Sequence, residues 1–211
     1  MSRRFTFVTA FAGALALGCG LTAAGPTVDR IESISIVPPR LALVPFQSVD
    51  LAVVAITSRG NQAETGLLQW STTGGTITSN GIINGVLHVT YSSPTAIGNY
   101  FFTVTAVTGA PSGTADIAVT ATPVPVNMVT VTPANLSLTV GDTTRLYATL
   151  TEATGRVVVG RLVDWSSSNS AVATVVAAGA TGSIRAIGVG TATITATSEG
   201  HSGTSVVTVT P

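Results

Sequence analysis

The sequence has little charge and few side chains that could ligate a metal. Charged residues make up 9% of its 211 residues, against the roughly 25% of typical soluble domains. All nine basic residues are arginines and the formal net charge is zero, which excludes a basic surface for nucleic acid. One cysteine and two histidines cannot form a structural zinc site, an iron–sulfur cluster or a disulfide framework. We therefore expect no metal site and no cofactor.

Residue patterns that support catalysis are also missing. His88 and His201 fall in different halves of the chain, and both are expected to be solvated. The carboxylates are dispersed, and the chain has no Asp-x-Asp-x-Asp-Gly calcium loop and no Gly-x-Ser-x-Gly nucleophile elbow. The sequence therefore predicts a protein that is not an enzyme.

The first 24 residues have the three parts of a secretory signal peptide. Two arginines precede an apolar stretch at residues 5–17, and small residues follow. The apolar stretch is shorter than the roughly 20 residues that span a bilayer. Residues 16–19, Ala-Leu-Gly-Cys, resemble a bacterial lipobox, although leucine is usual where Ala16 stands.

Two cleavage sites remain open. Cleavage before Cys19 would leave residues 1–18 as the signal peptide, a lipid anchor on Cys19 and a tether at residues 19–30. Cleavage after Ala24 would instead remove Cys19 with a signal peptide of residues 1–24. The first alternative predicts a lipoprotein of the outer membrane or cell surface, and the second a secreted or periplasmic protein.

The chain contains an internal repeat. Residues 35–43 align with residues 130–138, and the same offset of 95 residues pairs Trp70 with Trp165. Between the copies lies Pro-Val-Pro, and proline favours an extended chain. We predict two domains, residues 31–122 and 127–211, joined by a linker at residues 123–126.

Within each copy, apolar residues alternate with polar ones. Residues 145–151, Arg-Leu-Tyr-Ala-Thr-Leu-Thr, and residues 191–197, Thr-Ala-Thr-Ile-Thr-Ala-Thr, have an apolar residue at every second position. This period is typical of antiparallel strands with one solvated face. Clusters of turn-forming residues interrupt the pattern, at residues 58–61, 79–81, 109–113, 153–155 and 199–203. The sequence thus predicts an all-β fold of two tandem antiparallel β-sandwiches, each with about seven strands.

The second copy resembles a bacterial Ig-like domain of group 2, the module of intimins and invasins. The residues that carry the resemblance, within 127–211, are 130–141, 165–175 and 187–196. Residues 28–122 resemble a related bacterial Ig-like domain, but they lack the Ser-Ser-Asn…Ala-Thr-Val block of the second copy. The resemblance implies Ig-like sandwiches with a role in surface adhesion, protein–protein contact or spacing.

Aromatic side chains are the candidate contact residues. Trp70 and Trp165 are expected to pack between the sheets of each sandwich, and Tyr100 shares the core-facing parity of its strand. Tyr91 and Phe101 are then the outward-facing pair, which could stack on a sugar ring.

These observations predict a non-catalytic protein of the cell envelope that serves adhesion, protein–protein contact or spacing. The alternative is a carbohydrate-binding module at the envelope or secreted. A surface of low charge and open sheet edges favours association, although such surfaces are also common in secreted bacterial β-domains. The expected partner is a protein or a glycan at the envelope, or a second copy through sheet edges, with membrane contact through a lipid anchor only.

Overall fold

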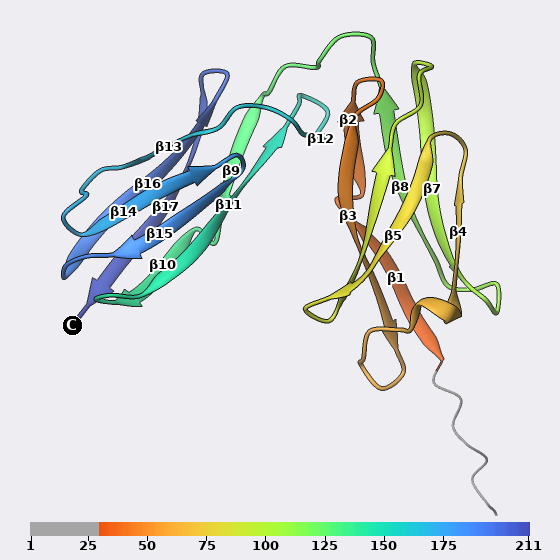
Figure 1. The fold of residues 1–211 in the computed structure, drawn as a ribbon, viewed down its shortest axis with the longest axis horizontal. Helices are drawn as coiled ribbons and strands as arrows, with labels where there is room; N and C mark the ends of the chain where they lie inside the picture. Colours follow the sequence, from red (N-terminus) through yellow and green to blue (C-terminus); the bar gives the residue numbers. More distant parts are fainter. Residues whose placement is uncertain (1–29) are drawn as a thin grey trace, which may run out of the picture.

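The computed structural model describes residues 30–211, which form two β-rich lobes connected at one end (Figure 1). The strands of the first lobe are β1 (Ile31–Val37), β2 (Arg40–Leu43), β3 (Ser48–Thr57), β4 (Leu68–Thr72), β5 (Thr76–Ile83), β6 (Val86–Ser92), β7 (Gly98–Ala106) and β8 (Ser112–Val119). Those of the second lobe are β9 (Met128–Thr132), β10 (Asn135–Thr139), β11 (Thr143–Thr151), β12 (Val157–Val158), β13 (Asp164–Ser167), β14 (Ala173–Ala178), β15 (Thr181–Ala186), β16 (Gly190–Ser198) and β17 (His201–Thr210). The lobes thus have eight and nine strands, more than the seven expected for each.

Each lobe is a sandwich of two sheets. In the first lobe one sheet has the strand order β1-β3-β6-β5, and the facing sheet has the order β2-β8-β7-β4. In the second lobe one sheet has the order β10-β17-β16-β13, and the other contains β14, β15 and β11, with β9 paired to β11. Strand β12 pairs with β11 and also with β2 of the first lobe, so one sheet continues from lobe to lobe. The predicted all-β sandwich fold is confirmed.

The alternating sequence pattern produces one hydrophobic core in each lobe. Along β11, Leu146, Ala148 and Leu150 are buried, whereas Arg145 and Tyr147 on the opposite face are exposed. The three apolar residues expected to be buried along β16 are buried as well. Two separate clusters result, one drawn from β1–β8 and one mainly from β9–β17. Burial of these side chains stabilises each sandwich by about 25 cal/mol per Å² of apolar surface.

The two tryptophans lie at the edge of each core, where they are only partly buried. Trp70 packs against the first core and Trp165 against the second. The indole N–H of Trp165 donates a hydrogen bond to the carbonyl of Gly179, at 3.0 Å. The ring lies over Gly182, where a Cβ atom would approach the ring to 2.8 Å. Gly182 therefore provides the space that the tryptophan needs.

One predicted turn is wrong. Residues 79–81, Ser-Asn-Gly, lie inside β5, where the register with β6 shifts between Ser79 and Gly81. Gly81 has a φ of +80°, so the glycine accommodates a β-bulge and not a chain reversal.

Helical structure is slight in the part of the chain that the structure describes. It is limited there to one 3-10 turn, Thr65–Leu67, and none of the described residues forms a helix long and apolar enough to cross a bilayer. The predicted signal peptide, Cys19 and nearly all of the tether lie outside the described residues.

We predict that Gly182→Ala destabilises the second lobe, because the added methyl group overlaps the ring of Trp165. The free energy of unfolding should fall by about 1–3 kcal/mol, measured by urea denaturation followed by tryptophan fluorescence. Gly66→Ala is the control, since a Cβ atom at Gly66 would meet nothing within 4 Å. Equal stability of the two variants would contradict the packing role of Gly182.

Candidate functional site

The most specific arrangement of side chains lies at the junction between the lobes. There β12 pairs in parallel with β2, Val157 opposite Leu41 and Val158 opposite Ala42. Ala42, although part of the first lobe, is buried in the core of the second, and Val159 packs against the core of the first. Each lobe therefore contributes an apolar side chain to the other.

An arginine from the second lobe binds an aspartate of the first. Nη2 of Arg156 lies 2.7 Å from Oδ2 of Asp116. Its Nη1 donates to the carbonyl oxygens of Asp116, at 3.2 Å, and Leu41, at 3.4 Å. The Arg156 side chain is only 15% exposed, so water screens this ion pair less than a surface pair. Several charge-assisted bonds from one planar guanidinium fix direction as well as distance.

Two further side chains of the first lobe cross the junction. Nη1 of Arg40 donates to the carbonyl of Thr154 at 3.2 Å. Nε2 of Gln47 donates to the carbonyl of Val159 at 3.0 Å. Nε2 of Gln47 lies 2.7 Å from where a Cβ atom of Gly160 would be, so a side chain there would displace the Gln47 amide. Gly160 also has a φ of +72°, a conformation that favours glycine.

The predicted linker is packed against the second lobe. Val126 is buried, and its N–H donates to Oε2 of Glu199 at 2.8 Å. Arg161 donates to the carbonyl of Val124 at 2.8 Å and lies 3.1 Å from Oε1 of Glu199. The segment is therefore fixed to the second lobe at Val124 and at Val126.

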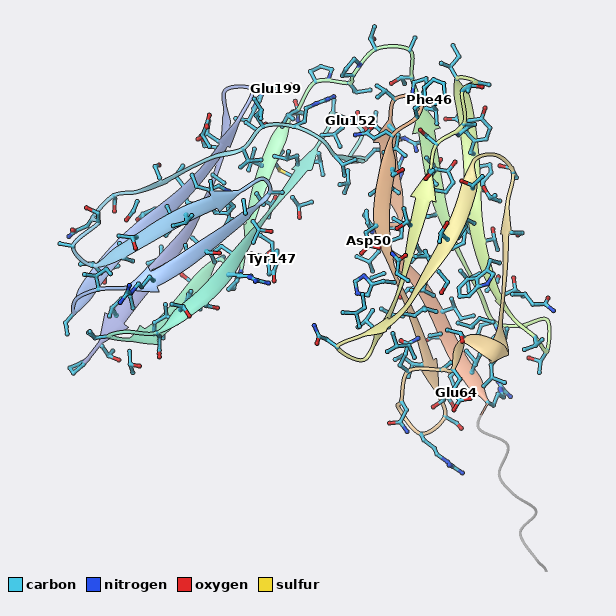
Figure 2. The ribbon with its side chains drawn as sticks, viewed as in Figure 1. Phe46, Asp50, Glu64, Tyr147, Glu152 and Glu199 are labelled. Atoms are coloured by element: carbon cyan, nitrogen blue, oxygen red, sulfur yellow. The ribbon has the colours of Figure 1, made fainter. Side chains whose placement is uncertain are left out.

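A buried carboxylate shapes the loop that carries Arg156. Glu152 accepts hydrogen bonds from the N–H of Thr154, at 2.8 Å, and of Arg156, at 3.0 Å, and from the Thr154 hydroxyl. Burial raises the pKa of Glu152, but these hydrogen bonds and the charge of Arg156 outweigh it, and the net pKa lies below its usual value. Glu152 and Glu199 both lie near the junction (Figure 2).

The expected outward pair of Tyr91 and Phe101 is not present. Tyr91 is completely buried, its hydroxyl donates to the carbonyl of Gly74 at 2.8 Å, and burial raises its pKa. Leu87, Val89 and Tyr91 alternate with polar residues along β6. This alternation by itself indicates that the three side chains face the core. Phe101, on β7 of the other sheet, is 45% exposed. The prediction that Tyr91 faces outward and could stack on a sugar ring is therefore wrong.

Tyr100, the other aromatic residue for which we predict a core position, faces the core of the first lobe. Tyr100 packs against the first core, and its hydroxyl donates to the carbonyl of Ala96 at 3.0 Å. A Cβ atom at Gly74 would lie 2.4 Å from the Tyr100 ring, so glycine is required beneath it.

A cluster of three polar side chains that the sequence did not predict lies on the outer face of the first lobe. Nδ1 of His88 is 2.6 Å from Oδ2 of Asp50, and Asn80 donates to Oδ1 of the same carboxylate at 3.1 Å. His88 is therefore not simply solvated. His88 lies on β6, Asp50 on β3 and Asn80 on β5. These three strands are neighbours in one sheet, and the register of their pairing brings the side chains together. Within residues 30–211, no group of three or more metal-ligating side chains occurs.

A family model and several solved structures match parts of this chain. Residues 125–210 match the family model of the bacterial Ig-like domain (group 2). Domains 5–6 of the S-layer protein SbsC have a similar structure, with a TM-score of 0.53 and 18% identity over 86% of this chain and 98% of that chain. For a fragment of SbsC domains 4–9 the TM-score is 0.53 and the sequence identity is 17%. The match covers 86% of this chain and 32% of that chain. For the adhesin InvE of Yersinia pseudotuberculosis the TM-score is 0.34 and the sequence identity is 19%. The match covers 89% of this chain and 62% of that chain. No curated protein sequence matches the chain.

We predict that Arg156→Ala loosens the junction while both lobes stay folded. The change removes the guanidinium that binds Asp116 and the two carbonyl oxygens, each bond being worth about 1.5–3 kcal/mol. Small-angle X-ray scattering should show a broader distribution of interatomic distances, with unchanged far-UV circular dichroism. Arg145→Ala, on an exposed face of the second lobe, is the control. An unchanged distribution for Arg156→Ala would show that the ion pair does not hold the lobes.

We predict that Glu152 makes stability depend on pH. Because its folded-state pKa is lowered, its contribution is complete above the unfolded value of about 4.5 and is lost as the pH falls through the folded value. The difference in unfolding free energy between the wild type and Glu152→Gln, measured with urea at several pH values, should be largest near neutral pH and shrink in acid. A difference that stays constant with pH would contradict this assignment.

Proposed function

We propose, because residues 125–210 are a bacterial Ig-like domain of group 2, that this protein is a non-catalytic component of the cell envelope. In this proposal the two lobes are tandem Ig-like domains, residues 31–122 and 127–211. They make protein–protein contacts and hold a fixed distance between them and the membrane. The family supports contact and spacing, whereas fold alone does not assign a ligand.

The observation that carries the spacer role is the sheet that continues through the junction. Strand β12 bonds to both lobes, and Arg156 closes the same junction with an ion pair to Asp116. A flexible linker would let the second lobe sample many orientations. The bonded junction and the packed segment at Val126 instead support one orientation.

The surface supports contact with other proteins. With a net charge of zero, copies and partners experience little long-range repulsion. Strand β5 ends one sheet of the first lobe and has eight residues, none of them charged and none of them proline. Such an edge offers free backbone groups to an added strand.

The proposed location in the cell depends on the N-terminal segment. A signal peptide of residues 1–18 and an acylated Cys19 would attach the chain to a membrane through the tether at residues 19–30. The chain enters the first lobe at the end opposite to the junction (Figure 1). The second lobe would then be the part farther from the membrane.

The alternative of a glycan-binding module depended on Tyr91 and Phe101 both facing outward. Tyr91 is buried, and Phe101 alone remains exposed as a stacking surface. Protein–protein contact is therefore the function that we propose.

We predict that Cys19→Ala releases the protein from the membrane. Wild-type cells should retain it in the membrane fraction, and external protease should cleave it, because the acylated cysteine anchors it outside. Ala24→Arg is the matched variant, since it blocks general signal-peptidase cleavage after Ala24 and leaves Cys19 intact. Release of the wild type to the same extent as Cys19→Ala, together with failure of Ala24→Arg to be processed, would overturn the lipid anchor and favour a secreted or periplasmic protein.

A further inference from the structure

Strand β4 is an edge strand without the residues that usually protect an edge. It pairs with β7 and ends its sheet, on the side of the first lobe that faces away from the second lobe (Figure 1). Its five residues, Leu-Gln-Trp-Ser-Thr, include no charge and no proline. Natural edges often carry such residues, because free backbone groups attract a further strand. The matching strand of the second lobe carries Asp164, 95 residues after Gln69.

The backbone groups of Trp70 and Thr72 point to the free side of β4. In an antiparallel pair, every second residue bonds to the partner strand and the residues between them point away. Leu67 accepts a hydrogen bond of 2.9 Å from the residue after β7, and Thr73 donates one of 3.0 Å to β7. The odd-numbered residues of β4 therefore bond to β7. Trp70 and Thr72 offer their N–H and carbonyl groups to a further strand.

A pocket lies beside this free side. Its volume is about 410 Å³, and its lining includes Trp70 and Thr72 of β4 with Ile77 and Ser79 of β5. None of the described residues that line it is charged, and the partly buried Trp70 and Ile77 also pack against the first core. We call it the Trp70 pocket. It has room for one apolar side chain, since a cavity of roughly 150 Å³ already accepts a benzene ring.

The second lobe covers its own tryptophan with backbone carbonyls. The indole N–H of Trp165 donates to the carbonyl of Gly179 at 3.0 Å. Beside it, Oγ of Ser167 on β13 donates to the carbonyl of Ala173 on β14, at 2.7 Å. Within residues 30–211, the indole N–H of Trp70 donates to no such group. Polypeptide therefore covers this position in one lobe and leaves it open in the other.

Strand register explains the difference between the lobes. On β15, Gly182 lies opposite Leu146 and leaves space for the ring of Trp165. On β6, the fully buried Val89 lies opposite Leu51, which is the counterpart of Leu146 at the offset of 95 residues. A ring placed as that of Trp165 would overlap the Val89 side chain. The tryptophan of the first lobe instead lines the pocket at the edge.

The junction shows that an edge of this fold binds a strand of another domain. Strand β12 of the second lobe adds in parallel to β2, at the edge of the first lobe's sheet. Two residues of β12 form this pairing, and side chains beside it supply further contacts. Strand β4 ends the same sheet on its other side.

We propose that the free side of β4 binds an extended, uncharged segment of a partner protein as an added strand, with one apolar side chain of that segment in the Trp70 pocket. The backbone groups of Trp70 and Thr72 select a polypeptide, because an extended chain presents donors and acceptors at the spacing of a strand. The pocket selects an apolar side chain, since a charge there would lose hydration without gaining a partner. This inference rests on the proposed protein-contact function and names its site and the chemistry of the partner.

Amide hydrogen exchange, followed by NMR on the ¹⁵N-labelled protein, tests the free edge. The amides of Trp70 and Thr72 should exchange at least about tenfold faster than those of Gln69 and Ser71, which bond to β7. Equal protection of the four amides would show that the chain itself covers β4, and it would overturn the inference.

A peptide from this chain is the probe for binding. Residues 191–197, Thr-Ala-Thr-Ile-Thr-Ala-Thr, are uncharged and alternate as an added strand must. With the acetylated and amidated peptide at about 1 mM, the amides of Trp70 and Thr72 should become protected, and the indole N–H signal of Trp70 should shift. The indole signal of Trp165 is the internal control and should not move.

Substitutions in the peptide and in β4 separate side-chain from backbone recognition. A peptide with Ile194→Asp should bind at least about tenfold more weakly, because it brings a charge to the pocket. Thr72→Pro removes a donor from the free side of β4 and none from the β7 side, which an edge strand tolerates. It should weaken binding about tenfold, whereas Thr72→Val keeps the N–H and should bind as the wild type does. Both variants lose the same hydroxyl bonds to Gly74, so only the backbone donor distinguishes them.

Several results would overturn the inference. They are a lack of protection at about 1 mM peptide, or equal binding by Thr72→Pro and Thr72→Val. A shift of the Trp70 indole signal with a chitin hexasaccharide, but not with the peptide, would overturn it in favour of a glycan. A protein that binds no peptide but is still anchored through Cys19 and cleaved from outside the cell would leave the proposed function intact.

Discussion

The pairing of β12 with β2 is the interaction on which the arrangement of the molecule depends. It is short, only two residues long in β12, and a pair of backbone segments of that length is weak in water. Its strength comes from what surrounds it: the guanidinium of Arg156 on Asp116, and Ala42 buried in the opposite core. Together these contacts join two sandwiches that could otherwise move independently.

Charge is scarce in this chain but is concentrated where the lobes meet. Asp116 lies 2.7 Å from Arg156 and 3.9 Å from Arg40, and Glu199 pairs with Arg161 beside the linker. Desolvating an ion pair costs free energy that its attraction must offset. Such pairs gain little over apolar packing in stability, but they are directional and select one arrangement of two surfaces. This is the property that the proposed spacer role requires.

The interior of each lobe depends on close approach more than on polar contacts. Gly182 lies beneath Trp165, and Gly74 lies beneath Tyr100, in each case because a methyl group would overlap the ring. Interiors packed to crystal-like density leave no room for such a group. The likeness to SbsC domains 5–6, at 18% identity, therefore reflects a shared fold built on different side chains.

Local sequence determined the secondary structure, and residues 125–210 by themselves match the family model. Alternation of buried apolar residues with outward-facing ones, mostly threonine, in β11 and β16 favours strands with one buried face. The same rule, applied to Leu87, Val89 and Tyr91, would have placed Tyr91 inside. Tertiary structure alone decided which distant groups meet. Arg156 and Asp116 are 40 residues apart, and their contact depends on how one lobe sits against the other, which no local pattern encodes.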